Sequence, residues 1–241
     1  MVQMGMSPDK NTFASSYLSF ITSTGIPLPL PDNTDLLYPY EGDEVRRVMG
    51  LYFNKYYGDK SKRIFLIGIN PGRLGCGVTG INFTDADSLR DDCGIDCDFK
   101  GGRELSSRFI YEMINFMGGS ELFFSRYFLT ALSPLGFTCE GKNRNYYDTP
   151  ALMAHLKPWL VESFKRQIEM GAERRIAFSL GKGKNFKILK ELNAEHCFFE
   201  EILPLPHPRW VLQYKLKEKE TFLNMYDHEL NKAYRRCKDG C

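Results

Sequence analysis

An apolar run at residues 63–67, RIFLI, is followed at once by a cluster of glycine and proline at 68–72, GINPG. This pattern predicts a buried strand that ends in a loop. Three later stretches have a comparable apolar character and are expected strands, at 126–132, 174–180 and 197–203. A chain that buries such strands on both faces favours a parallel sheet covered on each side.

Apolar residues recur at helical spacing between and around the expected strands. The expected helices lie at 9–24, 43–57, 104–117, 150–170, 184–193 and 216–235. Thr149 followed by Pro150 is typical of an N-cap and a first helical residue, and it fixes the start of one helix. Strands that alternate with helices predict a mainly parallel sheet, whose ligands bind beyond the carboxyl ends of the strands.

The bulk composition fits one domain spanning residues 1–241. The chain has 43% hydrophobic and 26% charged residues, which is ordinary for a globular protein. Its apolar runs are all shorter than the roughly 20 residues that cross a bilayer, and residues 1–20 lack the apolar core of a secretory signal. We expect a cytoplasmic monomer without membrane contact.

The charge distribution says more about partners than the net charge of +2 does. Residues 84–104 hold seven acidic and three basic residues, whereas residues 182–219 hold eight basic and five acidic ones. One face of the protein is therefore expected to be basic. A basic face is typical of proteins that bind nucleic acid. The alternative for Lys215, Lys217 and Lys219 is an ordinary solvated face.

Three patterns resemble known sites but lack a required feature. Gly75 to Gly80 satisfies GxGxxG, yet it neither follows the strand directly nor opens a helix, as a dinucleotide fingerprint must. The GKGK sequence at 181–184 is no Walker loop, because Phe178 and Asn185 break that pattern. It is either a structural turn or a contact for a nucleic-acid phosphate. Two CxxxC pairs are spaced more widely than zinc sites prefer, so no metal is expected.

Residues 68–83, GINPGRLGCGVTGINF, carry a family resemblance. The stretch resembles the single-strand-selective monofunctional uracil-DNA glycosylases, which have GMNPG at its start and TGVPF at its close with the same spacing. Shorter matches follow in order at 104–109, 132–135 and 205–209, similar to the EVSxxRF, LCPL and HPSPR of that family. The resemblance covers residues 63–235, the expected catalytic core, and leaves residues 1–60 as a helical N-terminal cover.

This resemblance implies a fold and an activity. The fold is α/β, a three-layer α/β/α sandwich with a central, mainly parallel four-stranded sheet. The activity is hydrolysis of the N-glycosidic bond of uracil or a related damaged base in DNA, for base-excision repair. The expected partner is DNA, single-stranded or duplex, and no cofactor is expected.

The resemblance also assigns the catalytic residues. Asn70 would orient the attacking water and His207 would hydrogen-bond the departing base, as a reaction that forms a sugar cation and a base anion requires. Phe83 would stack on the extruded base, and Gly72 stands where other uracil enzymes keep a bulky tyrosine. The structural alternatives are a surface role for His207 and a core role for Phe83.

Further positions belong to the same expected site. The remaining substrate-pocket residues are Ile69 and Ala131. The expected DNA contacts are Pro208, Arg209 and Trp210 at a loop tip, together with Lys182 and Lys184. For Arg209 and Trp210 the alternative is ordinary loop packing.

Two departures from the family leave the substrate open. The family reads uracil with an asparagine where this chain has Ala131, and the residues considered in its place are Asn82, Asn143 and Asn145. The HPSPR loop is shortened to HPR, so insertion into a duplex is weaker or relies on Trp210. A superfamily member that binds nucleic acid without excising a base is therefore a second hypothesis. A nucleotide-binding enzyme that uses the GKGK loop is a third.

Overall fold

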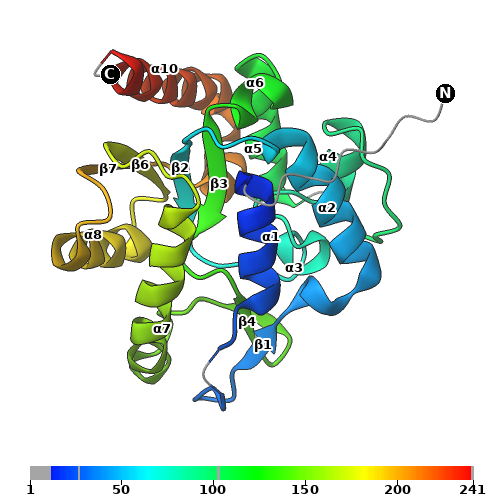
Figure 1. Cartoon of the computed structure of the whole chain (residues 1–241), viewed down its shortest axis with the longest axis vertical. Coiled ribbons are helices and arrows are strands. Elements are labelled where there is room, and N and C mark those ends of the chain that lie inside the picture. The colour runs from blue at the N-terminus through cyan, green and yellow to red at the C-terminus, as the bar shows by residue number, and fades with distance from the viewer. Residues whose placement is uncertain (1–11, 27, 102–103, 240–241) are drawn as a thin grey trace.

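The computed structural model describes residues 12–26, 28–101 and 104–239 (Figure 1). The strands are β1 (Asp35–Leu37), β2 (Ile64–Gly68), β3 (Tyr127–Ala131), β4 (Gly136–Cys139), β5 (Lys142–Arg144), β6 (Ile176–Leu180) and β7 (Glu201–Leu205). The α-helices are α1 (Phe13–Ser23), α2 (Asp43–Tyr57), α3 (Cys76–Thr79), α4 (Ala86–Asp91), α5 (Leu105–Phe116), α6 (Ser120–Phe124), α7 (Pro150–Glu169), α8 (Lys184–His196), α9 (Pro208–Tyr214) and α10 (Lys219–Lys238). Two 3-10 turns, η1 (Pro39–Glu41) and η2 (Leu216–Glu218), complete the elements. Residues 9–11, the expected start of the first helix, lie outside the described part of the chain.

Four parallel strands form the central sheet, in the order β3-β2-β6-β7. Every residue of β2, β3 and β6 is buried, because helices flank the sheet (Figure 1). β7 lies at the edge, a position that tolerates its Pro204. The arrangement confirms the predicted α/β fold, with a parallel four-stranded sheet between helices.

Most expected elements lie close to their observed bounds. α2 spans the expected residues, and Thr149 caps α7 by accepting the Leu152 backbone N–H at 3.2 Å. β7 begins at Glu201 and not at residue 197, because Cys197 takes the left-handed conformation at φ +52° and ends α8 there. The residues between Cys197 and Glu201 connect the end of α8 to the first residue of β7.

The chain after β7 is more helical than expected. His207 is the N-cap of α9 and Pro208 is its first residue, a position that suits the fixed φ of proline. Arg209 and Trp210 therefore lie in the first turn of a helix, which corrects their expected place at a loop tip. The expected helix at 216–235 is the turn η2 followed by α10.

A second, antiparallel sheet in the order β1-β4-β5 lies outside the prediction. Its strands are three or four residues long, too short to show alternation. Glu140 and Gly141 connect β4 to β5 with positive φ values of 50° and 70°, as a two-residue hairpin turn requires. At Gly136 an added Cβ would lie 2.5 Å from the Pro71 carbonyl oxygen, so the hairpin packs directly on the loop after β2.

A buried cation fixes the start of β2. The Arg63 side chain is fully buried, and its Nη2 donates to Asp59 Oδ2 at 2.9 Å. Its guanidinium lies 5.8 Å from the Phe13 ring centroid and 5.4 Å from that of Tyr57. A buried charge is stable only when it is paired and hydrogen-bonded, so these contacts join α1 to the end of α2 and to β2.

Within the described ranges, no helix is long and apolar enough to cross a membrane.

Candidate active site

Loops at the carboxyl end of the central sheet converge on a small cavity of about 130 Å³, here called the polar cavity. It is lined by Ile69, Asn70, Pro71, Gly72, Cys76, Asn82, Phe83, Glu104, Ser106, Ala131, Asn143, Asn145, His207 and Arg209. The structure thus brings together these sequence-predicted residues: Ile69, Asn70, Gly72, Phe83, Ala131, His207 and Arg209.

Backbone groups fix the Asn70 amide. Its Oδ1 accepts the Tyr146 N–H at 3.2 Å, and its Nδ2 donates to the carbonyl oxygens of Pro71 at 3.2 Å and Arg144 at 3.3 Å. The amide is therefore oriented by the β4–β5 hairpin and by its own loop. A carbonyl oxygen has two lone pairs, and Oδ1 accepts one hydrogen bond within the described structure. The second lone pair is available to a water.

Buried hydrogen bonds connect Asn70 to the end of β2. Tyr146, whose N–H holds Asn70, donates its hydroxyl to Asn185 Oδ1 at 2.7 Å. Asn185 donates its Nδ2 to the Gly68 carbonyl oxygen at 3.3 Å. Burial raises the pKa of Tyr146 well above its ordinary value, so the hydroxyl keeps its proton and stays a donor. Neither Tyr146 nor Asn185 was given this role by the sequence, in which nothing links the two positions.

Phe83 is held against the backbone at the end of β2. Its φ of +56° is rare for a residue other than glycine, and such strain is maintained by surrounding contacts. A Cβ on Gly68 would lie 2.6 Å from Phe83 Cζ, so the ring fits only beside a glycine. The ring is thereby fixed at the wall of the polar cavity, where a flat base is able to stack on it.

His207 is a neutral hydrogen-bond donor. Its Nδ1 accepts the Arg209 backbone N–H at 3.2 Å, so the single proton of the neutral ring is on Nε2. Burial, with the Arg209 charge as the smaller cause, lowers the pKa of His207 from 6.5 to about 4. At neutral pH the ring therefore presents an uncharged N–H.

The polar cavity has no amide at the end of β3, because Ala131 stands there. Asn82, Asn143 and Asn145 all line the cavity. Asn143 Oδ1 accepts a backbone N–H of the loop after β2 at 2.9 Å, and Asn145 Nδ2 donates to a carboxylate of its own loop at 3.2 Å. Asn82 is 6% exposed, and its one side-chain hydrogen bond in the described structure is a long contact of 3.5 Å to the Tyr17 hydroxyl. Each of the three amides thus makes one side-chain hydrogen bond within the described structure, and that of Asn82 is the longest.

Three further polar groups in the cavity had no role assigned from the sequence: Cys76, Glu104 and Ser106. Ser106 Oγ donates to Glu104 Oε1 at 2.8 Å. Burial raises the pKa of Cys76 to about 12, so its thiol is protonated at neutral pH and is no nucleophile. Among the residues that the structure describes, no group of three or more His, Cys, Asp or Glu side chains is placed to hold a metal ion.

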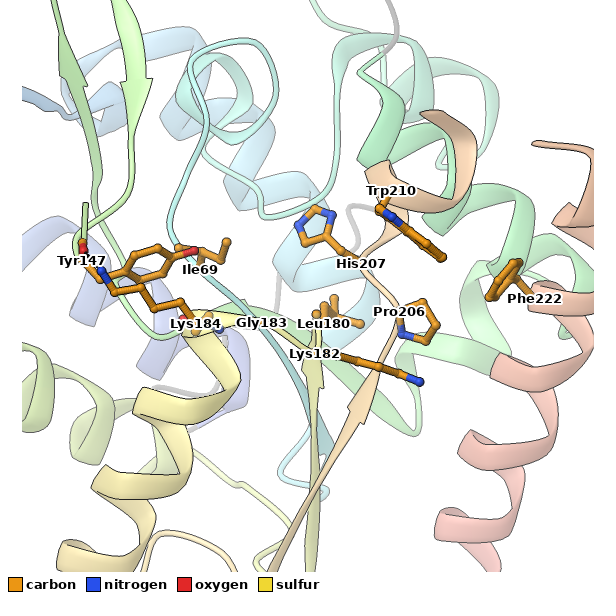
Figure 2. Close-up of a pocket in the computed structure, with 12 residues that line it drawn as sticks. Ile69, Tyr147, Leu180, Lys182, Gly183, Lys184, Pro206, His207, Trp210 and Phe222 are labelled. Atoms are coloured by element: carbon orange, nitrogen blue, oxygen red, sulfur yellow. Dashed lines mark hydrogen bonds between the residues drawn. The ribbon is translucent and has the colours of Figure 1, made fainter. Parts of the chain in front are cut away.

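A second, larger cavity of about 430 Å³ shares His207 and Ile69 with the polar cavity (Figure 2). It is here called the apolar cavity. The sequence-predicted residues Lys182, Lys184 and Trp210 line it, away from the polar cavity. Pro208, also a predicted DNA contact, lines neither cavity and is buried as the first residue of α9.

The neutral state of His207 predicts an unusual titration. In an NMR titration of the four histidines, assigned with a His207→Gln variant, the His207 ring should stay neutral at pH 6 and protonate near pH 4. The unfolded chain binds this proton at a higher pH than the folded chain, so the free energy of unfolding should fall as pH drops from about 6.5 towards 4. Titration of His207 near pH 6.5 would contradict this assignment.

Comparisons with known proteins agree with this geometry. Residues 55–231 match the family model of the uracil DNA glycosylase superfamily. The crystal structure of wild-type SMUG2 from Pedobacter heparinus is similar, with 35% sequence identity and a TM-score of 0.90 over 93% of this chain and 99% of that chain. A search of curated proteins gave no match. Because the family model spans well over half of the sequence, the chain belongs to the uracil DNA glycosylase superfamily.

Proposed function

We propose that the chain is a monofunctional DNA glycosylase that hydrolyses the bond between deoxyribose and uracil, or a related damaged base, in base-excision repair. The polar cavity carries the proposal, because an oriented amide of Asn70, the ring of Phe83 and a neutral His207 all line one space. Membership in the superfamily supports it.

The chemistry of the reaction fits these groups. When the C–N bond breaks, its electron pair leaves with the base, so the sugar becomes cationic and the base anionic. The Nε2–H of the neutral His207 ring donates a hydrogen bond to the base anion. The ring does not have to take up a proton before it can donate. Asn70 Oδ1 holds a water against the sugar carbon. An amide is a poor base, so the water forms its C–O bond late, after the base has largely left, and its proton passes to the base or to solvent.

The lining of the polar cavity favours water over an enzyme nucleophile. A bifunctional glycosylase attacks with an amine and forms a Schiff base. None of the described residues that line the polar cavity is a lysine, and its one thiol, Cys76, is protonated. Direct attack by water, with no covalent bond between enzyme and sugar, is therefore the reaction that this cavity supports.

Basic residues around the two cavities are the proposed contacts for the DNA backbone. The Arg209 and Lys182 side chains are exposed beside the polar and apolar cavities respectively. Lys184 begins α8, where unpaired backbone N–H groups also favour an anion. These charges position a strand but carry no base specificity.

Asn82 is the proposed reader of the base in place of the missing amide at Ala131. The Watson–Crick edge of uracil offers the O4 acceptor beside the N3–H donor. One carboxamide pairs with both, since Nδ2 donates and Oδ1 accepts. Asn82 is buried in the cavity wall directly before the constrained Phe83, and its Oδ1 accepts no hydrogen bond from the described residues. These features favour it over Asn143 and Asn145.

Replacing Asn70 tests the mechanism. Single-stranded and duplex oligonucleotides that contain uracil are incubated with parent protein and then with alkali, and strand breaks report base release. We expect Asn70→Ala to lower the single-turnover rate roughly 100-fold or more, because the water loses its orientation. Asn224→Ala, a surface change on α10, is the matched control and should release uracil as the parent does.

Two outcomes would overturn the proposal. Equal rates for Asn70→Ala and the parent would refute the mechanism. Tight DNA binding by the parent without release of uracil, hypoxanthine or xanthine would favour the non-catalytic member of the superfamily.

Replacing Asn82 tests the reading of the base. Asn82→Ala should lower kcat/KM for uracil by about tenfold to 100-fold, as loss of a bidentate contact to a base edge does. Asn82→Asp should lower it as well, because the carboxylate has no donor for O4. The kcat/KM of Asn145→Ala is measured for comparison. Thermal unfolding of each variant shows whether it is folded. Unchanged uracil release by both Asn82 variants would assign the reading to another group.

A further inference from the structure

The apolar cavity lies beside the polar cavity, and apart from His207 none of its walls was given a part in the bond-breaking step (Figure 2). Its walls are Ile69, Tyr147, Leu180, Gly181, Lys182, Gly183, Lys184, Asn185, Pro206, His207, Trp210 and Phe222. Its volume of about 430 Å³ is more than three times that of the polar cavity, at about 130 Å³. A cavity of this size holds a flat ring with room to spare.

Aromatic rings stand at two sides of the apolar cavity. Figure 2 shows Tyr147 on one side and Trp210 with Phe222 on the opposite side, with Leu180 and Pro206 between them. The Trp210 and Phe222 ring centroids lie 5.8 Å apart in an edge-to-face arrangement. Trp210 is nevertheless 41% exposed, which is unusual for so large an apolar side chain. Exposed aromatic rings beside a hollow are the platforms on which unpaired bases stack.

The charge around the apolar cavity fits a phosphodiester. Lys182 and Lys184 are exposed at its rim, and none of its twelve lining residues is acidic. The Lys184 ammonium lies 5.1 Å from the centroid of the Tyr147 ring, so cation and aromatic ring are presented together. Positive charge interleaved with aromatic rings is typical of grooves that hold single-stranded nucleic acid.

The position of the apolar cavity identifies its occupant. His207 and Ile69 line both cavities, so a ligand in one lies directly beside a ligand in the other. We propose that the apolar cavity binds the nucleobase next to the excised one in the same DNA strand. The identity of the ligand as DNA rests on the proposed function. A base seated there is unpaired, so the preferred substrate is a single strand or a locally opened duplex.

Binding measurements with base-deleted oligonucleotides test this proposal. Single-stranded oligonucleotides carry one 2′-fluoro-2′-deoxyuridine, which resists hydrolysis, and the nucleotide on its 5′ or 3′ side is either intact or an abasic tetrahydrofuran. The abasic form keeps the phosphate and removes only the base. We expect deletion of the base on one of the two sides to weaken binding by the parent about fivefold to 150-fold, the range typical of stacking on an aromatic side chain. Fluorescence anisotropy at one fixed salt concentration gives each Kd.

Two variants assign that loss to the cavity. In Trp210→Ala the intact and base-deleted oligonucleotides should bind equally, because the platform is gone. Tyr214→Ala removes a ring that is 66% exposed on the same helix but does not line the cavity, and it should behave as the parent does. Independently, Trp159→Phe leaves Trp210 as the single tryptophan. Its fluorescence should be quenched by the intact oligonucleotide and not by the base-deleted one.

Three results would overturn the proposal. The first is no loss on deleting either neighbouring base, and the second is an equal loss in the parent and Trp210→Ala. The third is displacement of the oligonucleotide by a free nucleoside monophosphate as effectively as by a second oligonucleotide, which would assign the cavity to a free nucleotide. If the parent protein releases uracil but its Kd does not depend on either neighbouring base, this inference alone is refuted. Base-dependent binding without release of any base would refute the glycosylase function alone.

Discussion

The end of β2 at Gly68 is the constraint on which the candidate site depends. Gly68 has no Cβ, and the Phe83 ring takes the space that a Cβ would fill. The Gly68 carbonyl oxygen accepts the backbone N–H that follows β3 at 3.1 Å and the Asn185 amide at 3.3 Å, so it aligns two strands with the start of α8. Through Asn185 and Tyr146 the same alignment reaches Asn70. Buried polar groups need hydrogen-bond partners, so removing one member of this series leaves its neighbour unsatisfied.

The protonation state of His207 depends on the two cavities that it lines. It stands between a polar and an apolar cavity, and the loss of water around the ring holds it neutral. A base seated against Trp210 would exclude still more water and strengthen the hydrogen bond from Nε2 to the leaving group. Under the two proposals, the neighbouring nucleotide therefore contributes to catalysis as well as to binding.

The sequence predicts the strands and helices of the central fold better than it predicts the contacts between distant segments. The strands of the central sheet and the start of α7 at Thr149 carry strong local signals, and the structure confirms them. Asn70, Phe83 and His207 were expected in one site from ordered motifs; they line one cavity, while their roles stay predictions. The contacts of Tyr146 and Asn185 had no sequence signal, since they cross between segments far apart in the chain. The β4–β5 hairpin, which precedes Tyr146 in the chain, has strands too short for periodicity to reveal.

A crystal structure with a bound substrate analogue would show whether the polar cavity holds the base that is cleaved. The ligand is a single-stranded oligonucleotide with one 2′-fluoro-2′-deoxyuridine. Uracil should lie on the Phe83 ring in the polar cavity, with a base oxygen within hydrogen-bond distance of His207 Nε2 and a water between Asn70 and the sugar. A uracil bound elsewhere, or a His207 whose Nε2 faces away from the base, would contradict the proposed mechanism.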